Sequence, residues 1–150
     1  MVTEEGIKTL EFNVRFGDPE TQAVLPLLEN DIVEVMQAAV ECRLDEITLR
    51  WKPRYAVCVV IASGGYPGKY ETGLPITGLE EAAQVPECVV FHAGTRKEGG
   101  SDSPPRGGRV LGVTALGDTL AQARGRAYDA VRCIQFEYMH YRTDIGIKWV

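Results

Sequence analysis

The chain has 150 residues, of which 45% are hydrophobic and 25% charged, and this composition is typical of one ordinary globular domain, or of one domain and a part. Its formal net charge of −5 argues against a general binder of nucleic acids or anionic membranes, whose surface would be basic. An anionic substrate must therefore be bound locally, by an arginine, a backbone nest or a metal ion.

The first predicted element is a β-hairpin of residues 1–5 and 7–16, with its turn at Glu5-Gly6. Its second arm contains the run LEFNVRF, in which apolar and polar residues alternate strictly. This alternation predicts a strand with one face on a core. The apolar residues expected to face that core are Leu10, Phe12, Val14 and Phe16.

The other face of this predicted strand carries Glu11, Asn13 and Arg15, spaced about 7 Å apart in succession. A carboxylate and an amide oxygen are hard ligands that suit magnesium, which completes its shell with water and substrate phosphates. An arginine one step further on could bind a phosphate oxygen as charge builds there. The alternative is an ordinary solvated strand face, and the pattern alone leaves both interpretations open.

A tight turn at Gly17-Asp18-Pro19 is expected to end this strand, where backbone N–H groups and a carboxylate can reach a ligand. The run TQAVLPLLEN that follows is apolar and contains Pro26, which predicts a short helical turn rather than a long helix.

A longer helix is predicted to begin after Asp31, a good N-cap residue with Glu34 three positions later, as in a capping box. One face of this helix is apolar and is expected to lie in a core. The residues of that face are Ile32, Val35, Met36, Ala39 and Val40.

From about Asp45 the chain is rich in strand-like runs separated by Gly/Pro stretches. These runs are ITLRW at 47–51, YAVCVVIAS at 55–63, CVVFHAGT at 88–95 and GRVLGVTALG at 108–117. The Gly/Ser/Pro-rich segment 96–108 between two of them is expected to form a mobile hairpin tip.

A second helix is predicted to open at Asp118 or Thr119. Its apolar stripe consists of Leu120, Ala123, Ala127, Val131 and Ile134. Because the strand runs are not separated by helices, the predicted fold class is α+β, with a mainly antiparallel sheet and a packed helix.

Other polar residues of the chain are expected to have structural roles. His92 is predicted to be a packed or hydrogen-bonded strand residue and His140 a surface residue, and no zinc site is expected. Arg142 and Asp144 are predicted to pin the tail by an ion pair rather than to contact substrate.

The cysteines stand far apart without a C-x-x-C pair, and they are expected to be buried, reduced thiols, which suits a cytoplasmic protein. They are Cys42, Cys58, Cys88 and Cys133. No apolar run approaches the roughly 20 residues of a membrane span, and the start MVTEEGIKTL has no signal-peptide core. Neither a membrane nor a nucleic acid is therefore expected among the partners.

Six segments of the chain, in one order, resemble the phosphoribosylamine–glycine ligase family, ATP-grasp enzymes of purine biosynthesis. The segments are EFNVRFGDPETQ, LPLLENDIVEV, ASGGYPGKYETG, FHAGT, GGRVLGVTALGDTLAQARGRAYDAV and YRTDIG. The resemblance covers essentially the whole chain but only the C-terminal third of the family's enzyme. It implies that residues 1–48 are the tail of an ATP-grasp domain and residues 49–150 the C-terminal domain, with the N-terminal part of the same enzyme as the missing partner.

The resemblance also implies roles for the residues of the alternating run. Glu11 and Asn13 would hold the Mg²⁺ or Mn²⁺ ions that bridge the phosphates of ATP, the co-substrate. Arg15 would be the catalytic residue beside the transferring phosphate. The residues at the substrate end of the site would be Gly17, Asp18 and Pro19.

The implied reaction joins glycine to 5-phosphoribosylamine at the expense of ATP and gives glycinamide ribonucleotide, ADP and phosphate. The chain by itself is expected to be inactive, because the lid that clasps ATP belongs to the missing part. The alternative hypothesis is a standalone binding or scaffold module that keeps only the fold.

Overall fold

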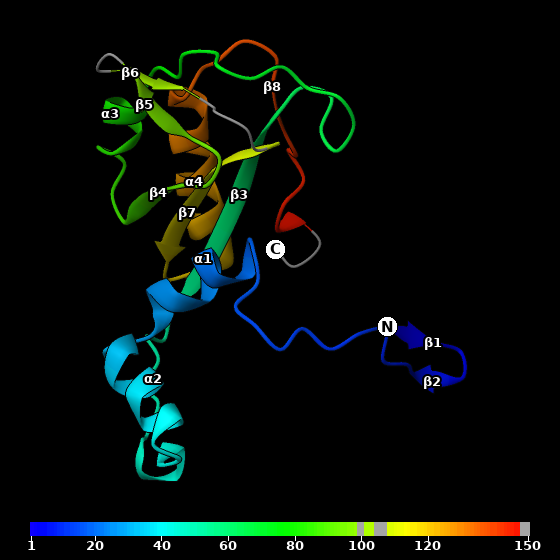
Figure 1. The fold of residues 1–150 in the computed structure, drawn as a ribbon, viewed down its shortest axis with the longest axis vertical. Helices are drawn as coiled ribbons and strands as arrows, with labels where there is room; N and C mark the ends of the chain where they lie inside the picture. Colours follow the sequence, from blue (N-terminus) through cyan, green and yellow to red (C-terminus); the bar gives the residue numbers. More distant parts are fainter. Residues whose placement is uncertain (99–100, 104–107, 148–150) are drawn as a thin grey trace.

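A computed structural model describes residues 1–98, 101–103 and 108–147 (Figure 1). The helices and strands fall into an extended N-terminal part and a sheet with a packed helix. In chain order they are β1 (Val2–Thr3), β2 (Gly6–Ile7), α1 (Glu20–Val24), η1 (Leu25–Leu27), α2 (Ile32–Val40), η2 (Leu44–Glu46), β3 (Tyr55–Ser63), α3 (Leu79–Ala82), β4 (Cys88–His92), β5 (Arg96–Glu98), β6 (Ser101–Ser103), β7 (Arg109–Gly117), α4 (Leu120–Cys133) and β8 (Met139–Tyr141).

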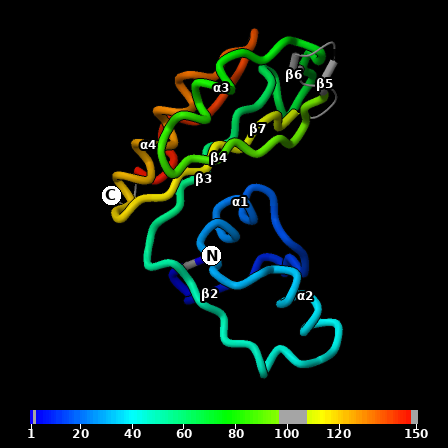
Figure 2. The backbone as a smooth tube through the Cα atoms, turned by 90° about the vertical axis from the view of Figure 1, so that its left-hand side faces the viewer, coloured from blue at the N-terminus to red at the C-terminus, as the bar shows by residue number. Residues whose placement is uncertain are grey.

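The main sheet has the strand order β4-β7-β3-β8, and each neighbouring pair is antiparallel. β3 pairs with β7 from Tyr55↔Gly117 to Ala62↔Arg109, with a register shift after Ile61. α4 lies on one face of this sheet and α1 near the other (Figure 2). The predicted α+β class, with a mainly antiparallel sheet and a packed helix, is confirmed.

The core lies between the sheet and α4, as strand alternation requires. Successive side chains of a strand point to opposite faces, and the odd-numbered residues of β3 and β7 pack with α4 in one buried cluster. These residues are Val57, Val59, Ile61, Leu111, Val113 and Ala115. The even-numbered positions Gly112 and Thr114 lie instead toward α1 and η1.

α4 begins and packs as the sequence predicts. Its N-cap is Thr119, whose hydroxyl accepts a hydrogen bond from Gln122 N at 3.1 Å. Ala123 and Ala127 of the predicted stripe are fully buried, and their small side chains let the helix lie close to the sheet. At Gly117 the approach leaves no room for a side chain, because an added Cβ would stand 2.4 Å from Ala123 N.

The predicted strand at residues 7–16 is wrong for this chain. The hairpin β1-β2 ends at Ile7, and residues 8–16 form an extended arm on which Phe12 is 85% and Val14 97% exposed (Figure 1). A strand needs a neighbour for its backbone N–H and C=O groups, and no strand of the described residues pairs with this arm. The expected core face of Leu10, Phe12, Val14 and Phe16 is therefore exposed.

The helical segment after the arm follows the predictions in part. α1 and η1 form the predicted short turn around Pro26. Asp31 caps α2 as predicted, its carboxylate accepting from Val33 N at 2.8 Å. The predicted core face of α2 is wrong, because Ala38 is the helix's only buried residue and Met36 is exposed. Little of the described chain lies against this helix, which projects away from the sheet (Figure 2).

The predicted strand at 47–51 is also absent as such. Residues 48–52 instead run back along the helical segment, with one isolated bridge between Leu28 and Trp51 and a hydrogen bond from Lys52 Nζ to Pro26 O at 2.9 Å. The predicted domain boundary near residue 48 stays a prediction.

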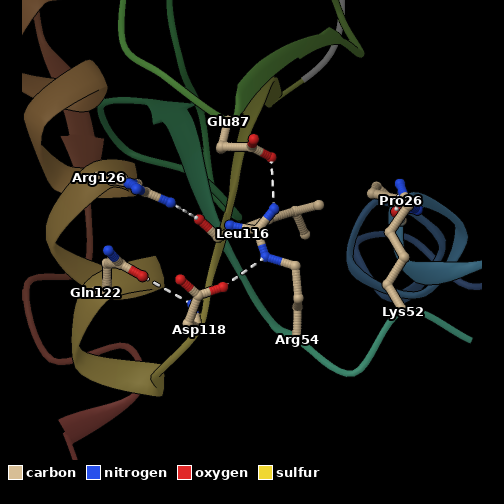
Figure 3. A network of polar contacts seen from close by, with 8 residues as sticks. All are labelled: Pro26, Lys52, Arg54, Glu87, Leu116, Asp118, Gln122 and Arg126. Carbon is tan, nitrogen blue, oxygen red and sulfur yellow. Dashed lines mark hydrogen bonds and ion pairs between the residues drawn. The ribbon is translucent and has the colours of Figure 1, made fainter.

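A polar network holds the point where the chain enters the sheet (Figure 3). Arg54 donates to Glu87 at 2.7 Å and to Asp118 at 3.1 Å, so it joins the start of β3 to the segments beside β4 and β7. Arg126 of α4 donates to Leu116 O at 2.7 Å in the same network. These contacts fix the entry of β3 within the packed unit.

Two further predictions concern the remaining segments. β5 and β6 pair as a hairpin, and of the predicted mobile tip at 96–108, residues 99–100 and 104–107 lie outside the described residues. No helix in the described part of the chain has the length and apolar character needed to cross a membrane.

Candidate functional site

The two predicted metal ligands lie side by side on the extended arm. Asn13 Nδ2 donates a hydrogen bond to Glu11 Oε1 at 3.0 Å, and both side chains are exposed. The carboxamide uses its NH₂ group in this contact, so the contact leaves its Oδ1 oxygen free to act as a ligand. Extended backbone places residues two apart on the same side, and this is what brings the pair together although the strand itself is not formed.

The donor set of this pair fits a hard divalent cation. One carboxylate and one amide oxygen are ligands that magnesium takes, with water and phosphate oxygens filling the other positions. Within the residues that the structure describes, no group of three or more His, Cys, Asp or Glu side chains could hold a metal ion by itself. Glu11 and Asn13 can therefore supply one side of a magnesium site but not a complete protein cage.

Arg15 is placed beyond this pair and remains exposed. Its Nη1 atom donates to the neighbouring Phe16 O at 3.2 Å. That contact is local, so it does not fix the guanidinium relative to Glu11 and Asn13.

The Gly17-Asp18-Pro19 turn (the 17–19 turn) has many more contacts than the arm before it. Gly17 O accepts from Thr21 N at 3.0 Å and also from the Thr21 hydroxyl. Asp18 Oδ1 accepts from Gln22 Nε2 at 2.9 Å. These bonds join the turn to the first residues of α1.

Arg109, at the start of β7, joins the same turn to the sheet. Its Nη1 atom donates to Asp18 O at 2.8 Å, and its Nη2 atom lies 3.1 Å from Asp18 Oδ2. Sequence reasoning missed this residue, because 91 positions separate the partners and no local pattern links them. In the sequence, Arg109 is predicted only as part of the strand-like run GRVLGVTALG.

Two hollows flank the 17–19 turn. One of about 300 Å³ is lined by Gly17 and Asp18 together with His92 of β4. The other, of about 280 Å³, is lined by Pro19 together with Arg109 and other side chains of the sheet. The volumes of both hollows are at or just below the lower limit for ligand pockets. Small chemical groups can therefore approach the turn from both hollows.

A third hollow, of about 750 Å³, lies between η1 and the start of β4 and is lined by Cys88 among mainly apolar residues. Burial raises the pKa of the Cys88 thiol to about 11, so it is protonated at neutral pH and is no nucleophile there. Burial likewise raises the pKa of Cys58. The prediction of buried thiols is met only in part, because Cys58, Cys88 and Cys133 are half-buried and Cys42 is exposed.

The remaining polar predictions agree with the structure in part. Arg142 and Asp144 form the predicted ion pair, with Nε–Oδ1 and Nη2–Oδ2 distances of 2.9 and 2.6 Å, but the pair lies within the tail, and the absence of a substrate contact stays a prediction. His92 Nδ1 lies 2.8 Å from the Thr95 hydroxyl, and His140 is exposed.

The fold and the arm together define the class of this protein: an α+β domain, with an antiparallel sheet and one packed helix, that follows an extended segment on which a carboxylate and a carboxamide lie side by side. The family model described as "Phosphoribosylglycinamide synthetase, C domain" matches residues 56–148, more than half of the chain. The chain belongs to this family, as the sequence motifs predicted.

Similar proteins cover nearly all of the chain. A phosphoribosylamine–glycine ligase of Caldanaerobacter subterraneus subsp. tengcongensis is 51% identical over 146 residues, which are 97% of this chain and 34% of the relative. One of Rhodopirellula baltica is 52% identical over 149 residues, 99% of this chain and 34% of the relative. The bifunctional purine biosynthetic protein purD of Dictyostelium discoideum is 47% identical over 95% of this chain, which is 17% of that protein.

A solved structure agrees with these matches. The crystal structure of phosphoribosylamine–glycine ligase from Thermotoga maritima superposes with a TM-score of 0.74 at 33% identity, covering 96% of this chain and 34% of that one. The chain thus spans about a third of the length of the ligases that it matches.

Proposed function

We propose that this chain is the C-terminal part of a phosphoribosylamine–glycine ligase, which joins glycine to 5-phosphoribosylamine in purine biosynthesis with ATP as co-substrate. The observation that carries this proposal is the identity of 51–52% with proteins of that name over 97–99% of the chain. The contact between Glu11 and Asn13 also supports it, because it brings together a carboxylate and a carboxamide of the kind that a nucleotide-bound magnesium ion takes as ligands.

In the proposed reaction the carboxylate of glycine attacks the γ-phosphate of ATP, and the bond to the β-phosphate oxygen breaks to give glycyl phosphate and ADP. The amine of phosphoribosylamine then attacks the acyl carbon, phosphate leaves, and the amine loses a proton as the amide forms. Such phosphoryl transfer depends on positioning and charge neutralisation rather than on a protein nucleophile.

Each predicted site residue has one task in this scheme. Glu11 and Asn13 would hold Mg²⁺ or Mn²⁺, which when bound neutralises charge on the phosphates of ATP. The guanidinium of Arg15 would bind the oxygens of the transferring phosphate. Its exposure and its single local hydrogen bond leave it able to reorient toward that group. The residues that would border the amino-acid or sugar end of the site are Gly17, Asp18 and Pro19.

The rest of the same enzyme is the partner that this scheme requires. The arm presents one side of a metal site and an exposed apolar side, and neither is covered within the described residues. We therefore expect that the 150-residue chain alone makes no glycinamide ribonucleotide and that the N-terminal part supplies the groups that clasp ATP. Such an enzyme would work in the cytoplasm, where its small-molecule substrates are.

ADP release by the intact protein that contains this chain tests the proposal. Release that depends on glycine, phosphoribosylamine and ATP together is expected from the intact protein, and none from the 150-residue chain. An intact protein that folds and binds no ATP, or releases no ADP with all three substrates, would instead favour a non-catalytic module.

A further inference from the structure

We propose that Arg109 is a positioning residue of the ligase reaction. It ties the 17–19 turn to the sheet and so sets where the arm that carries residues 11–15 leaves the C-terminal domain. The expected effect of Arg109 on the reaction rate rests on the proposed function. The anchoring of the turn rests only on the contacts of Arg109.

The guanidinium of Arg109 recognises Asp18 at two points. One nitrogen donates to the backbone carbonyl at 2.8 Å, and the other lies 3.1 Å from the carboxylate. A planar guanidinium with two contacts fixes both the distance and the orientation of its partner, which a single contact cannot do. Because one contact is to the main chain, Arg109 holds the backbone of the turn and not only a side chain.

Arg109 is itself held rigidly. It begins β7 and pairs with Ala62 of β3, and Val110 and Leu111 after it are 0% and 1% exposed in the core. A functional group is placed more accurately by a sheet than by a loop. The backbone at Arg109 is therefore a fixed reference against which the turn is set.

The other described hydrogen bonds of the 17–19 turn are local. Thr21 and Gln22 donate to Gly17 and Asp18, and these bonds fasten the turn to α1. Among the hydrogen bonds and ion pairs of the described residues, the pair with Arg109 is the one that joins the turn to the sheet. It also uses Asp18 O and Oδ2 while Gln22 uses Oδ1, so each oxygen of Asp18 serves to hold the turn.

This pair contributes little to stability. Its side chains are 39% and 42% exposed, and ion pairs of that exposure are screened by water and add little to the free energy of unfolding. Reaction rates respond differently, because a displacement of about 1 Å in a reacting group can cost on the order of a hundredfold in rate. Loss of Arg109 should therefore lower the activity far more than the stability.

The test compares Arg109→Ala and Arg109→Lys with Arg54→Ala in the intact ligase. Arg54 is a matched control, because it also makes two ion pairs, with Glu87 and Asp118, but lies away from the turn. We expect Arg109→Ala to lower kcat/KM for glycine by about tenfold to a hundredfold, with an unchanged Tm. Arg109→Lys should be intermediate, since an ammonium cannot reproduce the two-nitrogen fork. Because the carboxylates of Glu87 and Asp118 are 46% and 77% exposed, Arg54→Ala should also change Tm little, and it should leave the kinetics at the wild-type level.

Chemical rescue separates positioning from general destabilisation. Millimolar guanidinium should restore part of the rate of Arg109→Ala, because it can occupy the vacated place beside Asp18, and it should not raise the rate of Arg54→Ala or of the wild type. Wild-type kinetics for Arg109→Ala in an active enzyme would overturn the inference and leave the proposed function standing. A loss of Tm that accounts for the loss of rate, without rescue, would overturn it as well.

Amide hydrogen exchange on the 150-residue chain tests the structural part without any activity. The amide of Thr21, which donates to Gly17 O at 3.0 Å, should exchange at least severalfold faster in Arg109→Ala, whereas the amides of β3 should be unaffected. Unchanged exchange at Thr21 would overturn the anchoring role. If the intact wild-type protein releases no ADP, the proposed function and the kinetic part of this inference both fall, and the exchange result still decides the anchor.

Discussion

Phe12 and Phe136 provide a matched test of the division of this chain into an extended arm and a packed sheet. Phe12 is 85% exposed on the arm, whereas Phe136 is 7% exposed in the cluster between the sheet and α4. Replacing a buried phenylalanine by alanine removes its contacts and leaves a cavity, at a cost of about 3–5 kcal/mol. An exposed side chain away from special features usually changes stability by no more than about 0.5 kcal/mol.

We therefore expect Phe136→Ala to lower the free energy of unfolding of the 150-residue chain by about 3–5 kcal/mol, and Phe12→Ala by less than about 0.5 kcal/mol. Urea unfolding followed by far-UV circular dichroism measures both, and an unchanged m-value shows that the same surface is exposed on unfolding. A loss of more than about 2 kcal/mol for Phe12→Ala would refute the reasoning, because a loss of that size requires a buried ring.

The same pair of variants gives a different result if the arm becomes a strand in the intact ligase. There Phe12→Ala should also cost about 3–5 kcal/mol, as the alternation of the sequence predicts for a residue on a core. The difference between the two proteins then measures how much of the arm the rest of the enzyme covers. Equal, small losses in both would show that the arm stays exposed in the complete enzyme.

Three further predictions test the site, the distribution of stability and the thiols. In the intact ligase, Glu11→Ala should cost about 3 kcal/mol in the transition state, on the order of a hundredfold in rate, while Tm stays unchanged because alternation places the side chain on the face opposite Phe12 and away from a core; near-normal turnover at saturating magnesium would argue against a ligand role. On the free chain, hydrogen exchange should show strong protection at 56–62 and weak protection at 8–16, and equal, high protection of both in a monomer would mean that the arm is a finished structure. The pKa of Cys88, raised to about 11 by burial, means that the neutral thiol is favoured in the folded chain; its contribution to stability is present below the ordinary thiol pKa and is lost as the pH rises toward 11. Iodoacetamide at pH 8 should therefore modify the exposed Cys42 well before Cys88, as peptide mass spectrometry can check, and equal rates would contradict the burial of Cys88.

The sheet and α4 could be predicted from the sequence, because the periodicity of their apolar residues is a local pattern and the segments against which they pack belong to the same chain. The stripe of α4 has helical spacing and is buried against strands of the same chain, so periodicity and burial agree. The alternation from Leu10 to Phe16 is as regular, yet it gives an exposed arm. Alternation indicates that a segment is suited to a half-buried strand. It does not indicate whether the neighbouring strand lies in the same 150 residues.

The candidate site was predictable to the same extent. Side chains two apart in an extended segment share a side, so the contact between Glu11 and Asn13 follows from the sequence pattern without a formed sheet. The contact between Arg109 and Asp18 depends on how the chain folds back over 91 positions, and no spacing rule contains that information. The exposed face of α2 was missed for the same reason as the arm, since an apolar stripe indicates a need for a partner but not its location.

The separation of the core from the chemistry has a consequence for how substitutions should act in this protein. The buried residues that hold the fold lie mainly in β3, β7 and α4, whereas the residues proposed to bind magnesium and phosphate lie on an exposed arm. Substitutions in the first group change stability and reach activity only through unfolding. Substitutions of Glu11, Asn13 or Arg15 on the arm should change activity with little effect on stability. Arg109 stands between the groups, because its backbone belongs to the sheet and its guanidinium to the turn before α1. A residue in that place fixes the position of the arm relative to the sheet. Its loss should therefore allow a small displacement of the arm, and such a displacement should lower the reaction rate strongly.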